Sequence, residues 1–316
     1  MTDQQSPEPL HRLIRKIRHP AALRELMAAC LRSAYMGDPF AGGEGYSPNL
    51  PEHLLKEVVT AEETISGIRC VIYTPKDASG KLPFMLYMHG GGFVIGSSED
   101  TDYVTRMLCY SNRVVVVSVN YRLAPETVFP GALADCEQVL NSVIAQSAQL
   151  GINPNSGYLA GDSAGANLAI ALYCRARGHR EAVKGLILLA PWLDMNVENY
   201  DSFNRLAPSG VVFDSAFLAY ARAAYTNFEQ WKNPEASPLF SLLTELPPTM
   251  VHIGTEDPLI DQSLRLQENA LVSGCNQIEI EIYSGMPHCF YSFPNLYKEE
   301  QDCYKRISDF IARTLA

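Results

Sequence analysis

The sequence predicts an α/β protein with a largely parallel, doubly wound sheet, and two observations carry that prediction. From about residue 55 onward, short strand-like runs alternate with longer helix-like segments. Most of the strand-like runs are continuously apolar, as expected of strands that helices cover on both faces. Alternation of this kind along most of a chain is typical of a doubly wound sheet.

The expected elements follow from apolar periodicity and from the turn residues between them. The expected strands are Ile68–Thr74, Phe84–His89, Val114–Tyr121, Gly157–Asp162, Gly185–Pro191, Met250–Gly254 and Ile278–Tyr283. The expected helices are Asp102–Tyr110, Ala132–Gln149, Ala164–Arg177, Gln262–Ser273 and Glu300–Ala316.

Two regions depart from the alternation. Residues 1–50 carry one or two amphipathic helices interrupted at Pro20, because proline ends a helix. Residues 195–240 contain a further helical piece, Phe213–Tyr225, with Asp214 as its expected cap. We expect these two regions to pack together as a small helical lid over the carboxyl edge of the sheet. Residues 51–316 then form the main domain, with the lid insertion near 195–240.

Composition and charge exclude several classes of protein. With 25 Lys and Arg against 35 Asp and Glu, the formal charge is −10, which disfavours nucleic acid and anionic membranes as partners. No run approaches the length of a membrane span, and the polar, basic start does not resemble a signal peptide. The eight cysteines form no CxxC pair, which argues against structural zinc. These features predict a cytoplasmic protein.

The pentapeptide Gly161–Gly165 (GDSAG) is the strongest chemical motif. It follows one expected strand and opens the expected helix Ala164–Arg177, so it fits a sharp strand-to-helix turn. The flanking glycines are needed because side chains there would collide with neighbouring backbone. The turn exposes Ser163 at the sheet edge, at a helix N-terminus that favours developing negative charge. Ser163 is therefore the expected nucleophile.

The run His89–Phe93 (HGGGF) directly follows another expected strand. Consecutive glycines allow backbone N–H groups to converge on one point, as the alkoxide formed during ester hydrolysis requires. We expect Gly91, Gly92 and the N–H of Ala164 to form this oxyanion hole. His89 precedes the nucleophile and is expected to hold the loop by hydrogen bonds.

A nucleophilic serine needs a base, and three histidines follow Ser163 in the sequence. His179 lies in a basic helix end, where it is expected to be solvated. His252 lies within an apolar strand and is expected in the core. His288 follows Gly285–Pro287 in a loop beyond the last expected strand, so it is the predicted base.

The acid that orients the base is expected after the strand Met250–Gly254. Asp257 precedes Pro258, which keeps it extended and outside the next helix. Asp261 falls in the first turn of that helix and suits a supporting or capping role. Asp257 is the predicted acid, with Glu256 as the alternative.

These motifs together resemble the hormone-sensitive-lipase family of α/β-hydrolases, and its bacterial acetylesterase-like carboxylesterases above all. The resemblance spans residues 84–293 and includes HGGGF, the run Tyr121–Glu126 (YRLAPE), GDSAG, Asp257–Leu259 and Gly285–His288 in family order. It implies an α/β-hydrolase fold with a mostly parallel eight-stranded central sheet, flanking helices and a small helical lid. It also implies the triad Ser163, Asp257 and His288, with the oxyanion hole given above.

Two positions depart from the family pattern. Ala166 stands where the family usually has glycine, which adds one methyl group beneath the elbow and is expected to alter packing more than chemistry. Cys289 follows the base where the family usually has glycine. A thiol beside His288 would be a target for thiol reagents if it were exposed, although an inert buried cysteine is the simpler interpretation.

The predicted activity is hydrolysis of short-chain carboxylic esters, acetyl to hexanoyl, through an acyl-serine intermediate without metal or organic cofactor. The candidate substrate-binding residues are Phe93, Trp192, Phe213 and Phe290. An amidase or formamidase would use the same triad. A non-catalytic receptor on a hydrolase scaffold is disfavoured because all three triad residue types are present. The sequence leaves open whether the chain forms a homodimer.

Overall fold

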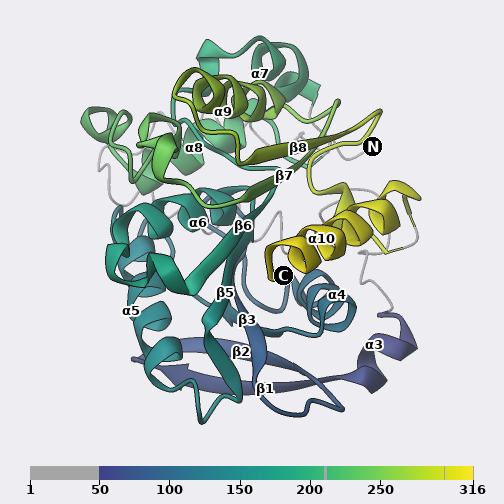
Figure 1. Ribbon diagram of the computed structural model, residues 1–316. Helices are drawn as coiled ribbons and strands as arrows, with labels where there is room; N and C mark the ends of the chain where they lie inside the picture. Colours follow the sequence, from purple (N-terminus) through teal and green to yellow (C-terminus); the bar gives the residue numbers. More distant parts are fainter. Residues whose placement is uncertain (1–49, 210–211, 295, 316) are drawn as a thin grey trace, which may run out of the picture. The chain divides into compact units, whose positions relative to one another are not determined.

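One eight-stranded sheet organises the protein, in the order β1-β2-β4-β3-β5-β6-β7-β8 (Figure 1). The computed structural model describes residues 50–209, 212–294 and 296–315, so the helices expected within residues 1–50 lie outside the described residues, apart from position 50. The strands are β1 Val58–Ile65, β2 Ile68–Pro75, β3 Leu82–Met88, β4 Val115–Val119, β5 Ile152–Asp162, β6 Val183–Leu189, β7 Thr249–Gly254 and β8 Ile278–Tyr283.

The sheet is mostly parallel, which confirms the predicted fold class. Strand β2 pairs antiparallel with both β1 and β4, and every other neighbouring pair runs parallel. The interior strands β4 and β7 are buried along their whole length, in agreement with their apolar sequences. Parallel pairing brings the carboxyl ends of β3, β5, β6, β7 and β8 to one edge, where the predicted site residues follow them.

Helices cover both faces of the sheet (Figure 1). Helices α4 and α10 lie together on one face, and α5 and α6 pack together on the other. The α-helices of the described residues are α3 Glu52–Glu57, α4 Asp102–Asn112, α5 Gly131–Ala145, α6 Ala164–Arg175, α7 Asp201–Leu206, α8 Ser215–Tyr225, α9 Ile260–Val272 and α10 Glu299–Leu315.

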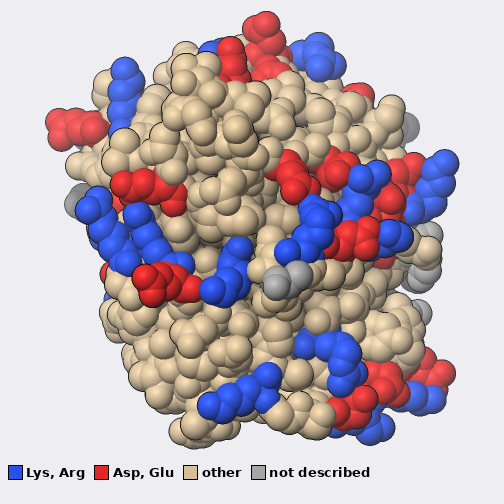
Figure 2. Space-filling model, in the orientation of Figure 1, with Lys and Arg blue, Asp and Glu red and all other residues tan. Residues whose placement is uncertain are grey.

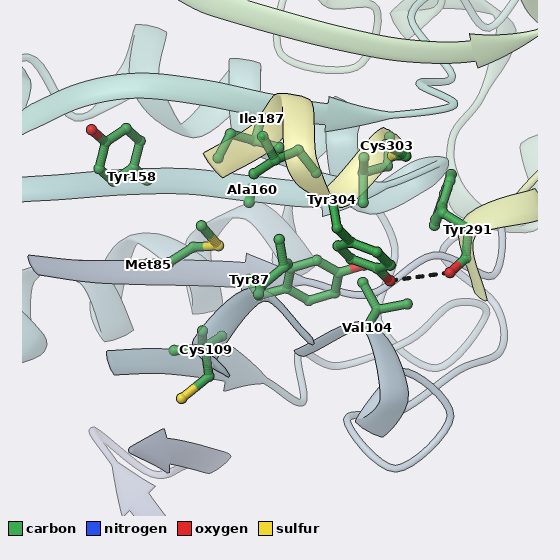
Figure 3. Packing of buried hydrophobic residues seen from close by; sticks show 14 of the residues in the cluster. Met85, Tyr87, Val104, Cys109, Tyr158, Ala160, Ile187, Tyr291, Cys303 and Tyr304 are labelled. Carbon is green, nitrogen blue, oxygen red and sulfur yellow. Dashed lines mark hydrogen bonds between the residues drawn. The ribbon is translucent and has the colours of Figure 1, made fainter. Parts of the chain in front are cut away.

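The hydrophobic core between the sheet and helices α4 and α10 contains several polar aromatic groups. Figure 3 shows Tyr87 from β3 beside Tyr304 from α10 and Tyr291 from the loop before it. The Tyr304 hydroxyl donates to the Tyr291 carbonyl oxygen over 3.1 Å. Phe290 belongs to this core cluster, where its ring packs against those of Tyr283 and Tyr291.

The helix expected at Phe213–Tyr225 is α8, and its expected cap is present. The Asp214 carboxylate accepts a hydrogen bond from the Phe217 N–H over 2.7 Å, which satisfies one of the free donors of the first turn. The expected arrangement of this region as a lid with residues 1–50 stays a prediction.

Charged side chains of both signs are interspersed on the face shown in Figure 2. Ion pairs join α10 to the edge strand β8: Arg306 contacts Glu281, and Arg313 contacts Glu279, each at 2.8 Å or less. The acidic side chains therefore do not form a single patch on this face.

Candidate active site

The turn between β5 and α6 holds Ser163 in a backbone conformation that few residues adopt. Its φ is 53° and its ψ is −115°, and its N–H donates to the Leu189 carbonyl of the neighbouring strand over 2.8 Å. Its carbonyl accepts from the Trp192 N–H over 3.1 Å, so the strained residue is held on both sides. This conformation carries the side chain off the end of the sheet, as expected for a nucleophile elbow.

The glycines of the elbow are required by close backbone contacts. A Cβ on Gly161 would lie 2.6 Å from the Met88 carbonyl oxygen and equally close to the Gly165 oxygen. A Cβ on Gly165 would lie 2.6 Å from the His89 carbonyl oxygen, and closer still to that of Met88. Helix α6 can therefore begin directly against the end of β3 only because both side chains are absent.

His288 and Asp257 are joined in a buried pair. The Nδ1 of His288 lies 2.8 Å from Oδ2 of Asp257, and the two residues are 4% and 0% exposed. The other carboxylate oxygen accepts from the Leu259 N–H over 2.8 Å, which fixes the rotation of the carboxylate. Ser163 is 7% exposed and lies at the same edge of the sheet. Glu256, the alternative acid, is solvent-exposed.

The electrostatics of the pair favour the charged imidazolium. Burial alone would lower the pKa of His288, but the Asp257 carboxylate and the neighbouring Cys289 thiol raise it well above the usual 6.5. A base that gains a proton during a reaction is stabilised in this way, because the carboxylate beside it balances the charge it acquires.

The other two downstream histidines lie apart from this pair. His252 is buried within β7, where its Nδ1 lies 2.9 Å from the Tyr283 hydroxyl, and burial lowers its pKa to about 3. His179 is partly exposed and contacts Asn141 at 2.7 Å. Asp261, expected to support or cap, accepts from the Ser202 N–H at the start of α7 over 2.8 Å.

The glycine run after β3 has the backbone that the predicted oxyanion hole needs. Gly91 and Gly92 have φ of 102° and 62°, in the left-handed region that glycine adopts without strain. The ring of His89 is buried, stacks on Tyr121 at 4.2 Å and contacts the Gly90 carbonyl through Nδ1 at 2.7 Å. Burial lowers the pKa of His89 to about 4, so the ring is neutral and holds the loop.

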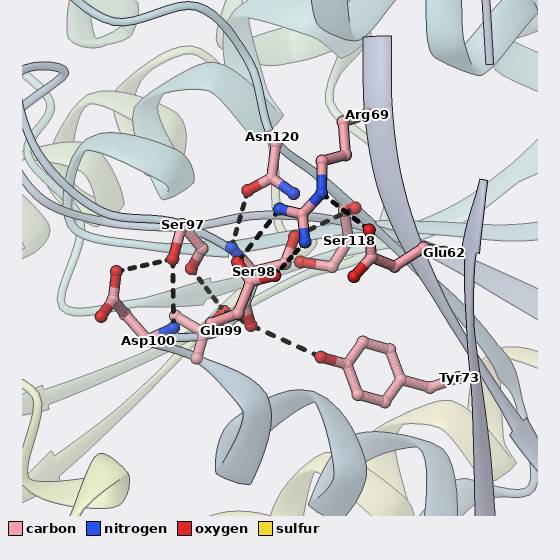
Figure 4. Close-up of polar contacts among 10 residues, drawn as sticks. Glu62, Arg69, Tyr73, Ser97, Ser98, Glu99, Asp100, Ser118 and Asn120 are labelled. Carbon is pink, nitrogen blue, oxygen red and sulfur yellow. Dashed lines mark hydrogen bonds and ion pairs between the residues drawn. The ribbon is translucent and has the colours of Figure 1, made fainter. Parts of the chain in front are cut away.

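The run that begins at Asn120 braces this loop at three points. The Tyr121 hydroxyl donates to the His89 carbonyl over 2.6 Å, and the Ala124 N–H donates to the Phe93 carbonyl over 2.8 Å. Asn120 accepts from the Ser98 N–H at the far end of the loop over 2.8 Å (Figure 4). The YRLAPE motif and its preceding asparagine therefore act through the shape of the HGGGF loop.

The four candidate substrate-binding aromatics lie in different surroundings, and two of them, Phe93 and Trp192, lie close together. Phe213 meets the His288 ring edge-on, with 4.7 Å between the ring centroids. Phe93 stacks on Tyr225 of α8 at 3.8 Å and lies 5.7 Å from Trp192. Phe290 is buried in the core between the sheet and α10, and its predicted contact with substrate stays a prediction.

Asp162 and Tyr87, which lie beneath the elbow, were not predicted to contribute to the site. Asp162 accepts hydrogen bonds from the Tyr87 hydroxyl over 2.6 Å and from the Gly90 N–H over 2.9 Å, both at Oδ1. Burial raises the pKa of Asp162 to about 6. The only sequence signal was an acidic residue directly before the nucleophile, and the partners come from another strand and loop.

Cys289 adopts a left-handed backbone with φ of 56°, and its Sγ accepts from the Tyr291 hydroxyl over 3.3 Å. Its side chain is partly buried against the core. Ala166 is fully buried near the start of α6.

Within residues 50–209, 212–294 and 296–315, no cluster of three metal-ligating side chains occurs, and no helix has the length and apolar character to cross a membrane.

Several curated proteins with similar sequences are esterases. An esterase from Acinetobacter venetianus is 31% identical over 247 residues, which cover 78% of this chain and 79% of the relative. A versiconal hemiacetal acetate esterase from Emericella nidulans is 33% identical over 248 residues, which cover 75% of this chain and 84% of the relative.

Solved structures agree with these relatives over nearly the whole chain. The thermostable carboxylesterase EstE1, cloned from a metagenomic library, has a TM-score of 0.76 at 31% identity, with 94% of this chain and 98% of that chain covered. An esterase of the bacterial hormone-sensitive lipase family has a TM-score of 0.76 at 25% identity, with coverage of 99% and 100%. The family model described as alpha/beta hydrolase fold matches residues 85–292. The chain therefore belongs to the α/β-hydrolase fold family, among the esterases of the hormone-sensitive-lipase type, and is a carboxylic ester hydrolase.

Proposed function

We propose that the protein is a serine carboxylesterase that hydrolyses short-chain esters, acetyl to hexanoyl, through an acyl-serine intermediate. The observation that carries this proposal is the buried His288–Asp257 pair, 2.8 Å apart, at the sheet edge where the strained elbow presents Ser163. A nucleophile, a base and an orienting acid are the three groups that acyl transfer to serine requires.

In the proposed first step, Ser163 Oγ attacks the ester carbonyl carbon while Nε2 of His288 takes the hydroxyl proton. Asp257 accepts the hydrogen bond of Nδ1–H, so the imidazole keeps the tautomer that leaves Nε2 free to act as base. The carbonyl oxygen becomes an alkoxide. Because amide dipoles are already oriented before the reaction, they stabilise that charge without reorganisation.

The proposed oxyanion donors are the N–H groups of Gly91, Gly92 and Ala164. As the tetrahedral intermediate collapses, the C–O bond to the alcohol breaks and His288 returns its proton to the leaving oxygen. Water then attacks the acyl-serine in the same way, with His288 again as base, and releases the carboxylic acid.

The preference for short acyl groups is supported by the position of α8 against the glycine loop. A Cβ on Gly92 would lie 3.0 Å from the Ala221 methyl and 3.2 Å from the Phe217 ring, so side chains of α8 pack closely against the glycine loop. The relative from Emericella nidulans is named as an acetate esterase, which agrees with a small acyl group.

Hydrolysis of p-nitrophenyl esters from C2 to C16 tests both parts of the proposal. We expect the highest kcat/KM between C2 and C6, and a fall of roughly 10⁴ to 10⁶ in kcat for Ser163→Ala. Ser308→Ala is the matched control, because it removes a hydroxyl that bonds to the Tyr304 carbonyl within α10. Retention of activity in Ser163→Ala refutes the nucleophile, and a maximum beyond about ten carbons refutes the chain-length preference.

A further inference from the structure

Asp162 is a buried carboxylate that the acyl-transfer steps leave without a role. It ends β5 directly before the elbow and is 7% exposed. Its Oδ1 accepts from the Tyr87 hydroxyl, which comes from the neighbouring strand β3, and from the Gly90 N–H in the loop after that strand. A buried carboxylate without partners is costly, whereas one that accepts two hydrogen bonds holds its donors firmly.

The Gly90 N–H belongs to a peptide unit that is held at both ends. The carbonyl of the same unit is that of His89, and it accepts from the Tyr121 hydroxyl over 2.6 Å. On the opposite side, the N–H of the unit donates to Asp162 over 2.9 Å. N–H and C=O point in opposite directions across a trans peptide, so these two contacts fix the rotation of the peptide plane.

The next peptide unit carries the proposed donor Gly91. Its carbonyl, that of Gly90, lies 2.7 Å from the His89 ring, so its N–H points away from that ring. The His89–Gly90 peptide unit packs directly against the Asp162 carboxylate, because a Cβ on Gly90 would lie 3.1 Å from Cγ of Asp162 and closer still to Oδ2. The orientation of the Gly91 N–H therefore depends on the Asp162 carboxylate through two successive peptide planes.

Resting on the proposed oxyanion hole, we propose that Asp162, oriented by Tyr87, is a positioning residue that aims the Gly91 and Gly92 N–H groups at the reacting carbonyl. It acts through the loop and touches no reacting atom. Loss of one oxyanion donor costs about 10²- to 10³-fold in kcat, and a displacement of about 1 Å can cost 10²-fold.

Three substitutions test how kcat depends on the hydrogen bonds of Asp162. Asp162→Asn keeps an oxygen that can accept both hydrogen bonds and removes only the charge, so we expect kcat to fall by roughly 3- to 20-fold. Asp162→Ala removes both acceptors, and we expect a fall of about 100-fold with KM changed less than about threefold. Tyr87→Phe removes one donor and is expected to lower kcat a few-fold. Tyr158→Phe is the matched control, since its hydroxyl contacts Thr314 on α10.

The distinguishing measurement is the inhibition constant of an aryl trifluoromethyl ketone, whose adduct with the serine places an alkoxide in the oxyanion hole. We expect this constant to rise across the variants in proportion to the fall in kcat/KM, while Tyr158→Phe keeps both values. If Asp162 only stabilised the fold, its variants would have a lower melting temperature, but the inhibition constant would not rise in proportion to the fall in kcat/KM.

Wild-type kcat and inhibition constant in folded Asp162→Ala overturn the proposal, as does a loss confined to KM. If Asp162→Ala does not fold, wild-type values in both Asp162→Asn and Tyr87→Phe overturn it equally. Failure of the proposed function itself is recognised separately, because Ser163→Ala would then stay active.

Discussion

A single methyl group at Gly165 tests how the elbow and the glycine loop are joined. In Gly165→Ala the new Cβ would lie 2.5 Å from the Met88 carbonyl carbon and 2.6 Å from the His89 carbonyl oxygen. An ordinary Cβ contact needs about 3.4 Å, so α6 must move away from the end of β3 by roughly 1 Å. All the obstructing atoms are backbone, and no side-chain rotation can relieve them.

This displacement falls between the proposed nucleophile and the loop that begins at His89. We expect overpacking to destabilise the fold by about 1–3 kcal/mol and the misplacement to lower kcat about 100-fold or more. Gly178→Ala is the control, because a Cβ there meets nothing within 4 Å and its backbone is not left-handed. It should keep the wild-type rate and unfold no earlier than the wild type.

The assay is p-nitrophenyl butyrate turnover for both variants, with thermal unfolding followed on the same preparations. Gly165→Ala with a rate within threefold of Gly178→Ala and an unchanged melting temperature would refute the reasoning. A loss of stability without a loss of rate would show that the strand end and the glycine loop move independently.

Three further predictions follow from other parts of the structure. Because the raised pKa of His288 leaves more of the base protonated, kcat/KM should fall as pH decreases, with an apparent pKa above 6.5; a flat profile from pH 5 to 9 would contradict this. The folded pKa of Asp162 is raised from 3.8 to about 6, so roughly 3 kcal/mol of stability is present below pH 4 and is lost as pH rises through 6. Urea unfolding between pH 4 and 7 measures this, and Asp162→Asn should remove that contribution. Asp214→Ala should cost about 1 kcal/mol of unfolding free energy by uncapping α8, and an unchanged urea midpoint would contradict it.

Much of the fold could be predicted because its strands are short apolar runs bounded by clear turns. The expected strand Ile278–Tyr283 coincides with β8, and the expected Met250–Gly254 differs from β7 by one residue. Strand β1 was not expected. Its interior residues are all exposed, and its sequence VVTAEETI shows neither an apolar run nor regular alternation. Pairing with β2 stabilises it, and a sequence pattern does not report that pairing.

Some parts of the site, too, could be predicted from the sequence and others could not. Residues whose local geometry follows from a turn motif, such as Ser163 at the elbow and the glycines of the loop, could be placed from their neighbours in the sequence. Asp162 and Tyr87 are 75 positions apart in the sequence, on neighbouring strands, so only the folded structure shows the hydrogen bond between them. Phe290 was a candidate as an aromatic residue near the sheet edge, and the fold shows what the sequence could not, that its ring packs in the core cluster.

The contacts of α8 have a consequence for the redesign of this enzyme. Helix α8 and the residues just before it make three such contacts. Phe213 contacts the predicted base His288, Phe217 and Ala221 lie against the glycine loop, and Tyr225 stacks on Phe93. Truncating these side chains would remove packing from the glycine loop that they contact. We therefore expect a variant shortened in this way to admit bulkier esters to lose turnover, unless a further change on the loop side restores the packing.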